Sequence, residues 1–331
     1  MTEAVVMPAI ETPAIETHQL SKGYGRTQAL APLDLIVPRG SVFALVGHNG
    51  AGKTTLIKLL MNILEPSSGS ATVLGQSAAT LGGQAFTHIG YVSENQELPE
   101  WMTVQGFLDY LRPFYPTWDA DDLVRQFDLP LNRKLKNLSR GMKMKAALAS
   151  VLAFKPPLIL MDEPFSGLDP LVRDELIEAL LDRMNDPAAE DGAGGSTPTT
   201  ILISSHDLGE IESFATHVGF LHQGRLLFAE PLATLTARFR EITVTVAEPV
   251  ALSNLHPSWL LPESSASVVR FIHTAANTEP VEEQIAAHLP GATNIEAQPM
   301  TLRAIFLTLA KSGRVPANSV QQDVRKNRSR S

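Results

Sequence analysis

Apolar and polar positions along much of this chain follow a pattern that predicts a repeat of strands and helices. Residues 42–46 are wholly apolar and have the length of a buried strand, and residues 55–61 after them have the spacing of a helix. Similar segments succeed one another from about Ile36 to about Phe228. This pattern predicts an α/β domain with a mostly parallel sheet.

One stretch inside this domain is predicted to be mainly helical. Between residues 95 and 154, apolar positions recur at helical spacing over residues 104–111, 121–127 and 140–154. A helical insertion in an α/β core indicates a subdomain with a task of its own.

Beyond Phe239 the pattern becomes that of a second, smaller domain, which we expect at residues 240–312. Short β-rich segments there alternate with amphipathic ones, which is typical of an α+β arrangement. The predicted strands lie at residues 242–246 and 268–272, and the predicted helices at residues 281–289 and 301–311.

Three segments have the composition of exposed or disordered chain. Residues 1–17 contain a near-duplicated Pro-Ala-Ile-Glu-Thr unit and are predicted to be a disordered leader, and residues 186–199 are predicted to form an exposed loop. Residues 313–331 form a polar tail, for which we expect disorder, with contact to anionic lipid as the alternative. Its basic residues are Arg314, Arg325, Lys326, Arg328 and Arg330.

A glycine-rich segment directly after the strand at residues 42–46 fits the phosphate-binding pattern G-x-x-x-x-G-K-[ST]. Glycines let the backbone wrap around a phosphate, and N–H groups at the start of the next helix point at it. Lys53 supplies a mobile positive charge, and Thr54 offers a hydroxyl to Mg²⁺. A turn without chemistry is the alternative, which the flanking strand and helix disfavour. The segment comprises Gly47, His48, Asn49, Gly50, Ala51, Gly52, Lys53, Thr54 and Thr55.

A second candidate for chemistry is the acidic end of the apolar segment at residues 158–161, where Asp162 and Glu163 follow. Carboxylates at the end of a buried strand are costly unless a cation meets them. Nucleotide-bound Mg²⁺ provides one, so Asp162 is predicted on the metal side and Glu163 as the group that activates water. The alternative is an ion pair that only closes the strand.

Together with further motifs, these segments resemble the nucleotide-binding subunit of an ATP-binding cassette (ABC) transporter, over residues from about His18 to Leu232. We therefore expect a P-loop ATPase domain at residues 18–239. Residues 138–142 resemble the family signature LSGGQ, and residues 165–169, which end in Asp169, resemble its D-loop. Residues 204–206 resemble the segment with the switch histidine, here His206, and Tyr24 resembles the aromatic residue that stacks on adenine.

The resemblance implies a site shared between two copies, with ATP and Mg²⁺ as cofactors. The phosphate loop, Asp162, Glu163 and His206 of one copy would face the signature of the other. For single residues a purely structural role is the alternative: an ordinary helix cap for Ser139, and packing for Tyr24 and His206. The signature residues are Ser139, Arg140, Gly141 and Met142.

Two motifs, the signature and the Q-loop, depart from the family pattern. Arg140 and Met142 replace a Gly and the Gln of LSGGQ, while the phosphate-facing Ser139 and Gly141 remain. In the Q-loop, Glu94 aligns with the family glutamine and Gln96 follows two positions later. A glutamate oxygen can still coordinate Mg²⁺ or hold water, so we place Glu94 on the metal side and expect altered metal affinity or hydrolysis.

The resemblance also implies partners. Because no run of about eighteen apolar residues occurs, we expect separately encoded transmembrane permease subunits and a location on the cytoplasmic face of the inner membrane. Residues 114–119 and 138–143 look most like bacterial ABC-2-type systems, generally exporters, and residues 299–306 resemble the closing helix of such subunits.

Composition narrows the remaining alternatives. The net charge of −8 gives no electrostatic reason to expect nucleic-acid binding, and the absence of cysteine excludes disulfides and thiolate metal sites. A soluble cassette ATPase that acts on ribosomes or DNA stays open as an alternative, as does a cassette that regulates a partner, against which Glu163 argues.

Overall fold

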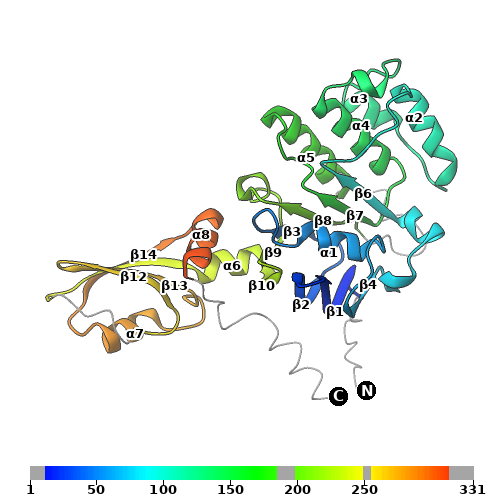
Figure 1. Ribbon diagram of the computed structural model, residues 1–331. Helices are drawn as coiled ribbons and strands as arrows, with labels where there is room; N and C mark the ends of the chain where they lie inside the picture. Colours follow the sequence, from blue (N-terminus) through cyan, green and yellow to red (C-terminus); the bar gives the residue numbers. More distant parts are fainter. Residues whose placement is uncertain (1–11, 185–197, 249–254, 313–331) are drawn as a thin grey trace, which may run out of the picture. The chain divides into compact units, whose positions relative to one another are not determined.

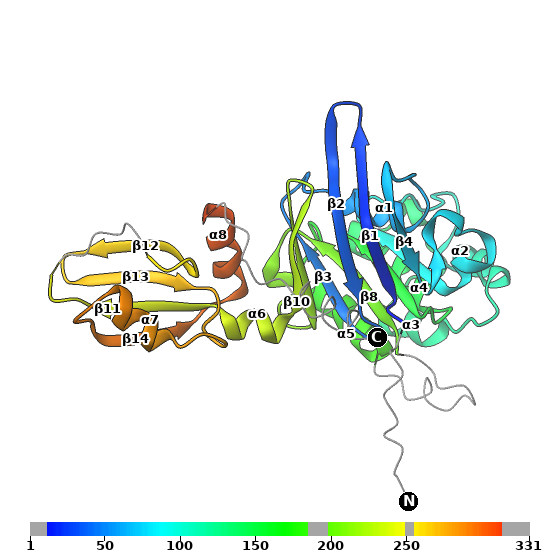
Figure 2. The ribbon, with the colours of Figure 1, turned by 90° about the horizontal axis from the view of Figure 1, so that it is seen from below.

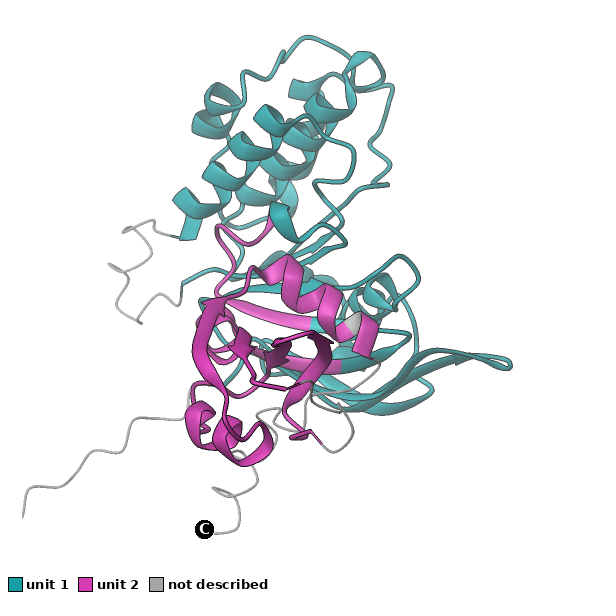
Figure 3. Ribbon diagram, turned by 90° about the vertical axis from the view of Figure 1, so that its left-hand side faces the viewer, with its two compact units in different colours: residues 1–210, 220–226 teal, residues 211–219, 227–331 magenta. Residues whose placement is uncertain are grey.

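The computed structural model describes residues 12–184, 198–248 and 255–312. The chain forms two compact units: unit 1 comprises residues 1–210 and 220–226, and unit 2 comprises residues 211–219 and 227–331 (Figure 3). The order of the elements is traced in Figure 1. The predicted leader up to residue 11, most of the predicted loop at 186–199 and the tail from residue 313 lie outside the described residues.

A six-stranded sheet carries the α/β domain that the sequence predicts, with strand order β10-β9-β3-β8-β7-β6. Its central pairs β3–β8, β8–β7 and β7–β6 are parallel, and β3, β7 and β8 are buried along their whole length. Continuous burial explains the uninterrupted apolar runs. The strands are β3 (Val42–Val46), β6 (Ile89–Ser93), β7 (Leu158–Asp162), β8 (Thr200–Ser205), β9 (His217–His222) and β10 (Arg225–Pro231).

A separate antiparallel sheet has the order β2-β1-β4-β5, and Figure 2 shows β1 and β2 as a long hairpin. β1 begins at Ile15, so residues 15–17 do not belong to a disordered leader as predicted. Ala14 and Ile15 are fully buried, and Ile15 pairs with Val37, so burial outweighs the repetitive composition. The strands are β1 (Ile15–Tyr24), β2 (Thr27–Val37), β4 (Ser68–Val73) and β5 (Gln76–Ser77).

Two helices of unit 1, α2 and α4, begin at residues whose side chains cap them. Thr103 accepts a hydrogen bond from the Gly106 N–H at the start of α2, and Ser139 accepts one from the Met142 N–H at the start of α4. α4 ends at Leu152 rather than at residue 154. The helices are α1 (Lys53–Leu60), α2 (Val104–Leu111), α3 (Asp121–Gln126), α4 (Arg140–Leu152) and α5 (Pro170–Met184). Short 3₁₀ turns lie at Ala78–Thr80, Gly83–His88, Arg112–Phe114, Leu135–Asn137 and Leu208–Glu210.

In its described residues, unit 2 contains an antiparallel sheet of order β12-β13-β11-β14 with the helices α6, α7 and α8. Its core includes Trp259 stacked on Phe271, with 3.9 Å between ring centroids. Two of its strands, β12 and β14, were not predicted. The boundary predicted at residue 239 lies inside this unit. Its elements are α6 (Leu232–Arg238), β11 (Arg240–Thr245), β12 (Trp259–Ser265), β13 (Val268–His273), α7 (Val281–His288), β14 (Thr293–Pro299) and α8 (Leu302–Ser312).

Within the described part of the chain, every helix is too short or too polar to cross a membrane.

Candidate nucleotide-binding site

The phosphate loop connects the buried end of β3 to the start of α1, as its sequence predicts. Glycine is required at two of its positions. A Cβ on Gly47 would lie 2.2 Å from the backbone oxygen of Leu221, and Gly52 has a φ of 107° with Ala29 O only 2.7 Å from an added Cβ. Three further loop residues are exposed to solvent: His48, Asn49 and Gly50.

Lys53 is the buried cation of this loop, with 5% of its surface exposed. Its ammonium donates to the carbonyl oxygens of Gly47 and, at 3.3 Å, His48, and lies 3.0 Å from Glu163 Oε1. The lysine therefore points back along the loop toward the acidic end of β7. An ammonium held beside a loop of this shape is suited to bind an anionic phosphate.

Asp162 ends β7 beside this loop and is buried, with 7% of its surface exposed. Its Oδ1 accepts hydrogen bonds from Thr54 Oγ1 at 3.1 Å and from Ser204 Oγ at 2.7 Å. The structure thus brings together Thr54 and Asp162, which were both predicted on the metal side. Sequence analysis missed Ser204, although its place at the end of an apolar strand, two residues before His206, was a usable signal.

Glu163 follows Asp162 with a φ of 52°, a left-handed backbone that a residue with a side chain rarely adopts. Its N–H donates to Ser204 O and Ser204 Oγ, and its Oε2 lies 2.7 Å from His206 Nδ1. Strain of this kind persists where surrounding bonds fix it. Lys53 and His206 thus hold the two oxygens of one carboxylate.

The shared position of these residues follows from the sheet. The phosphate loop, Glu94, Asp162 and His206 come directly after or at the ends of β3, β6, β7 and β8. In a parallel sheet these ends share one edge, which is where ligands bind in α/β folds. The Glu94 N–H donates to Asp162 O at 3.0 Å, which attaches the Q-loop to that edge.

The signature residues make a different set of contacts. Ser139 caps α4, and a Cβ on Gly141 would lie 3.2 Å from Val172 Cγ1 in α5. Arg140 donates from its guanidinium to Glu94 Oε1 at 2.6 Å, so a departing position of the signature contacts the departing position of the Q-loop. The structure brings Glu94 next to Arg140 by its side chain and next to Asp162 by its backbone.

Tyr24, Asp169 and Trp101 lie at exposed positions, whereas Gln96 is half-buried. Tyr24, at the end of β1, is 49% exposed, with Lys22 Nζ 5.2 Å from its ring centroid. Asp169 accepts from the Leu171 N–H at 2.9 Å and so begins α5. Gln96 turns back on its own loop, where Oε1 accepts from the Ser93 N–H at 3.4 Å. Trp101, in the segment after the Q-loop, is 73% exposed.

Two titratable groups near the site have shifted pKa values. Burial raises the pKa of Tyr91 in β6, where the Asp162 charge acts in the same direction and a Ser93 hydrogen bond opposes it. Burial also raises the pKa of Glu210, whose Oε2 accepts from Ser205 Oγ at 2.9 Å. Burial is the main cause of both shifts, because it disfavours the charged form of each group.

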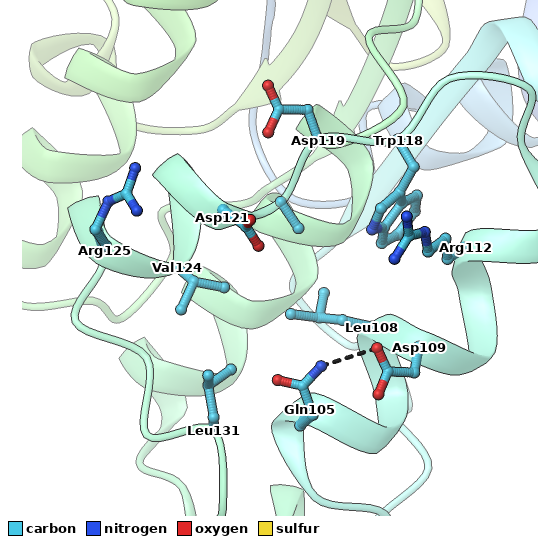
Figure 4. A pocket seen from close by; sticks show the side chains of 11 residues that line it. Gln105, Leu108, Asp109, Arg112, Trp118, Asp119, Asp121, Val124, Arg125 and Leu131 are labelled. Atoms are coloured by element: carbon cyan, nitrogen blue, oxygen red, sulfur yellow. Dashed lines mark hydrogen bonds between the residues drawn. The ribbon is translucent and has the colours of Figure 1, made fainter.

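A cavity of about 340 Å³ lies in the helical segment instead, lined by α2, α3 and the residues before α3 (Figure 4). Asp109 of α2 and Arg112, directly after α2, line it together with Asp121 and Arg125 of α3. The phosphate loop and the acidic pair do not line it. Its lining combines carboxylates with guanidinium groups, and carboxylates repel a triphosphate. The phosphate loop is therefore the better candidate site for a nucleotide.

Comparisons with known proteins also point to an ATP-binding protein. The family described as "ABC transporter" matches residues 30–166. The ABC transporter ATP-binding protein YtrB of Bacillus subtilis is 31% identical over 242 residues, covering 72% of this chain and 79% of the relative. The bacitracin transport ATP-binding protein BcrA of Enterococcus faecalis is 30% identical over 234 residues, covering 69% and 73%.

Solved structures show the same fold. The structure of an ATP-binding subunit of an ABC transporter matches with a TM-score of 0.58 and 32% identity, over 68% of this chain and 92% of that chain. A dimeric ATP-binding cassette, MJ0796, in a post-hydrolysis state with ADP and Pi, matches with a TM-score of 0.56 and 21% identity, over 66% and 98%. With these relatives and this phosphate site, the chain belongs to the ABC transporter family as an ATP-binding subunit and ATPase.

Proposed function

We propose that this ATPase powers a membrane exporter, as a peripheral subunit on the cytoplasmic face of the inner membrane with separately encoded transmembrane permease subunits. The observation that carries the proposal is the combination of a phosphate site with the strongly exposed Trp101 beside the Q-loop. The ABC ATPase domain would begin with β1 at Ile15, and residues 240–312, inside unit 2, would form an accessory α+β domain.

Each residue of the phosphate site has a role in this proposal. Lys53 would exchange the Glu163 carboxylate for phosphate oxygens when ATP binds, since both compete for one ammonium. Glu163, thereby released on one side, would accept the proton of the attacking water. His206 donates from Nδ1 to Glu163 and orients that carboxylate, and its other ring nitrogen would face the γ-phosphate or the water. Tyr24 would stack on adenine.

Mg²⁺ fits the residues on the metal side. Thr54 and Asp162 present a hydroxyl and a carboxylate 3.1 Å apart, which are the oxygen ligands that this ion prefers. In the described part of the chain no group of three or more His, Asp or Glu side chains forms a site from protein ligands alone. Phosphate-bound Mg²⁺ needs only one or two protein ligands, and it supplies charge neutralisation on the phosphates.

Two cassettes would complete the ATP site between them. Ser139 and Arg140 are exposed, and their bonds are to Met142 and Glu94, so both remain at the surface for a second copy. Ser139 and Gly141 place a hydroxyl, an amide N–H and the N-terminus of the 13-residue α4 together. Such a group suits a terminal phosphate. ATP would favour the closed pair, and hydrolysis would reopen it.

Export is the direction that the relatives favour. Relatives named for bacitracin transport and for Nod factor export cover 69% and 66% of this chain. The Nod factor export protein I of Cupriavidus pinatubonensis is 32% identical. Arg140 and Met142 lie in the segment that looks like ABC-2-type systems. We infer no nucleic-acid partner, since the net charge is −8.

The direct test is purification of the endogenous chain from native membranes after mild solubilisation. The proposal expects polytopic membrane proteins in fixed ratio with this chain, and loss of ATPase-coupled transport when Lys53 is replaced. Recovery only with ribosomes or DNA, and never with a membrane protein, would overturn it in favour of a soluble ATPase.

A further inference from the structure

The Q-loop and the start of the signature helix are joined by charge as well as by backbone. Arg140 donates to Glu94 at 2.6 Å, and three residues later Lys143 donates to Glu100 at 3.0 Å. One helical turn therefore presents two cations to two carboxylates of a single segment. We call these four residues the charge clasp.

Backbone bonds run beside the clasp. The Leu135 N–H donates to Met102 O at 2.9 Å, and the Lys136 N–H donates to Glu100 O at 3.3 Å. Residues 94–102 and 135–143 are thus fastened at both of their ends. Trp101 lies in the first of these segments. A displacement of its side chain by a binding partner would therefore be passed on to the signature through these contacts.

Arg140 also lies beside the D-loop. A Cβ on Gly167 in the D-loop would lie 3.1 Å from an Arg140 guanidinium nitrogen, so the guanidinium packs against that backbone. Gly167 has a φ of 64°, which a side chain would strain. Arg140 therefore contacts the Q-loop, the D-loop and its own signature turn within one copy.

We propose that Arg140 is a positioning residue whose ion pair with Glu94 holds the first turn of α4 against the Q-loop, ready for the nucleotide of a second copy. The proposal rests on the two-cassette arrangement proposed above. It also explains how a charged Q-loop residue is tolerated: Glu94, 28% exposed, carries a carboxylate that Arg140 neutralises. Arg140 is 51% exposed, so its guanidinium remains accessible.

Hydrogen exchange in the nucleotide-free protein tests the positioning directly. The amides to follow are those of Met142 and Lys143, which donate to Ser139 Oγ and Ser139 O. Arg140→Gln and Glu94→Gln are each expected to speed this exchange about threefold, as for loss of a half-exposed ion pair. The double variant should exchange no faster than either single one, and Arg140→Lys should keep the slow exchange.

A matched control is Arg125→Gln, which removes a cation from the exposed Arg125–Asp122 pair of the same helical segment. It should leave exchange at residues 142 and 143 unchanged. Unchanged exchange in Arg140→Gln, or additive effects of the two substitutions, would overturn the proposal.

The functional consequence is measured in a Glu163→Gln background as the ATP concentration that gives half-maximal dimer. Arg140→Gln should raise it about threefold and Arg125→Gln should not. If Arg140→Gln leaves the ATP concentration for half-maximal dimer unchanged, the Arg140–Glu94 pair has no role in dimerisation, even where hydrogen exchange is altered. If no variant dimerises, the two-cassette proposal fails and with it the role of the pair, whereas the exchange result still shows whether the contact exists.

Discussion

The two halves of the proposed nucleotide site, the phosphate half and the signature half, differ in how complete they are within one chain. Lys53 and Asp162 are 5% and 7% exposed, and the Glu163 side chain is 14% exposed, with partners for all three inside unit 1. Arg140, by contrast, is 51% exposed, and Ser139 is exposed as well. In the phosphate half, Lys53 and the acidic pair are thus built in and largely buried, although His48, Asn49 and Gly50 of the loop are exposed, whereas the signature half is left open at the surface.

The difference has a physical basis. Groups that meet developing charge work best when they are fixed beforehand in a water-poor site, so the hydrolytic side gains from burial. A surface that must bind and release a second molecule cannot be buried in the single chain. The site therefore separates chemistry from association, and substitutions in the two halves should fail in different ways.

The largest effect is expected in the built half, at Glu163. Glu163→Gln removes the proton acceptor but keeps the shape, so hydrolysis should slow at least about a hundredfold, the lower range for a lost general base. ATP should still bind, and dimers should accumulate with ATP. Turnover of the purified variant, measured alongside the exposed Glu178→Gln as control, decides this. Near-normal turnover would remove Glu163 from catalysis.

Next to the open half, in the segment after the Q-loop, a substitution should instead weaken assembly with the membrane partner. Trp101 is 73% exposed, so Trp101→Glu should not disturb folding, but a charge buried at a contact with a permease is costly. The expected result is roughly thirtyfold less membrane partner recovered, as for loss of an anchoring aromatic residue, with ATP binding at Lys53 intact. Ile63→Glu is a matched control at another exposed apolar side chain. Equal recovery with Trp101→Glu would place the contact elsewhere.

A smaller effect is expected at Ser204, in the built half. Ser204→Ala removes the hydroxyl that donates to Asp162 and accepts from the Glu163 N–H. Loss of such a supporting bond typically costs about tenfold in activity, here in kcat with little change in ATP affinity. Ser150→Ala, a buried serine whose hydroxyl bonds only within α4, serves as the comparison. A reduced ATP affinity with unchanged kcat would contradict this assignment.

The built half was largely predictable from the sequence because it is local. The phosphate loop lies within nine consecutive residues between an apolar strand and a helix, and Asp162 and Glu163 directly end another strand. Parallel pairing then brings these ends to one edge without further information. The geometry of Thr54, Asp162, Glu163 and His206 agrees with that reading, and their catalytic roles stay predictions.

The clasp was not predictable, because Glu94 and Arg140 are 46 residues apart and each departs from the family pattern for no local reason. Unit 2 shows a similar limit. β14 is exposed along its whole length and so lacks the alternation that marks a strand, and Pro262 interrupts β12. Pairing with neighbours defines both, and tertiary pairing leaves little trace in local sequence.

The smallest effect is expected where the two halves meet, at the Q-loop. The Glu94 N–H donates to the Asp162 backbone oxygen at 3.0 Å, and the Glu94 carboxylate pairs with Arg140. If that carboxylate acts on the metal side as predicted, Glu94→Gln should raise the Mg²⁺ concentration for half-maximal hydrolysis about threefold. Gln96→Ala should change it less than about twofold, because the Gln96 amide turns back to Ser93 and carries no charge. Titration of Mg²⁺ at fixed ATP on both variants measures the ranking. The reverse ranking would assign the role at the metal to Gln96. Glu94 would then have no role there and would serve only as the partner of Arg140.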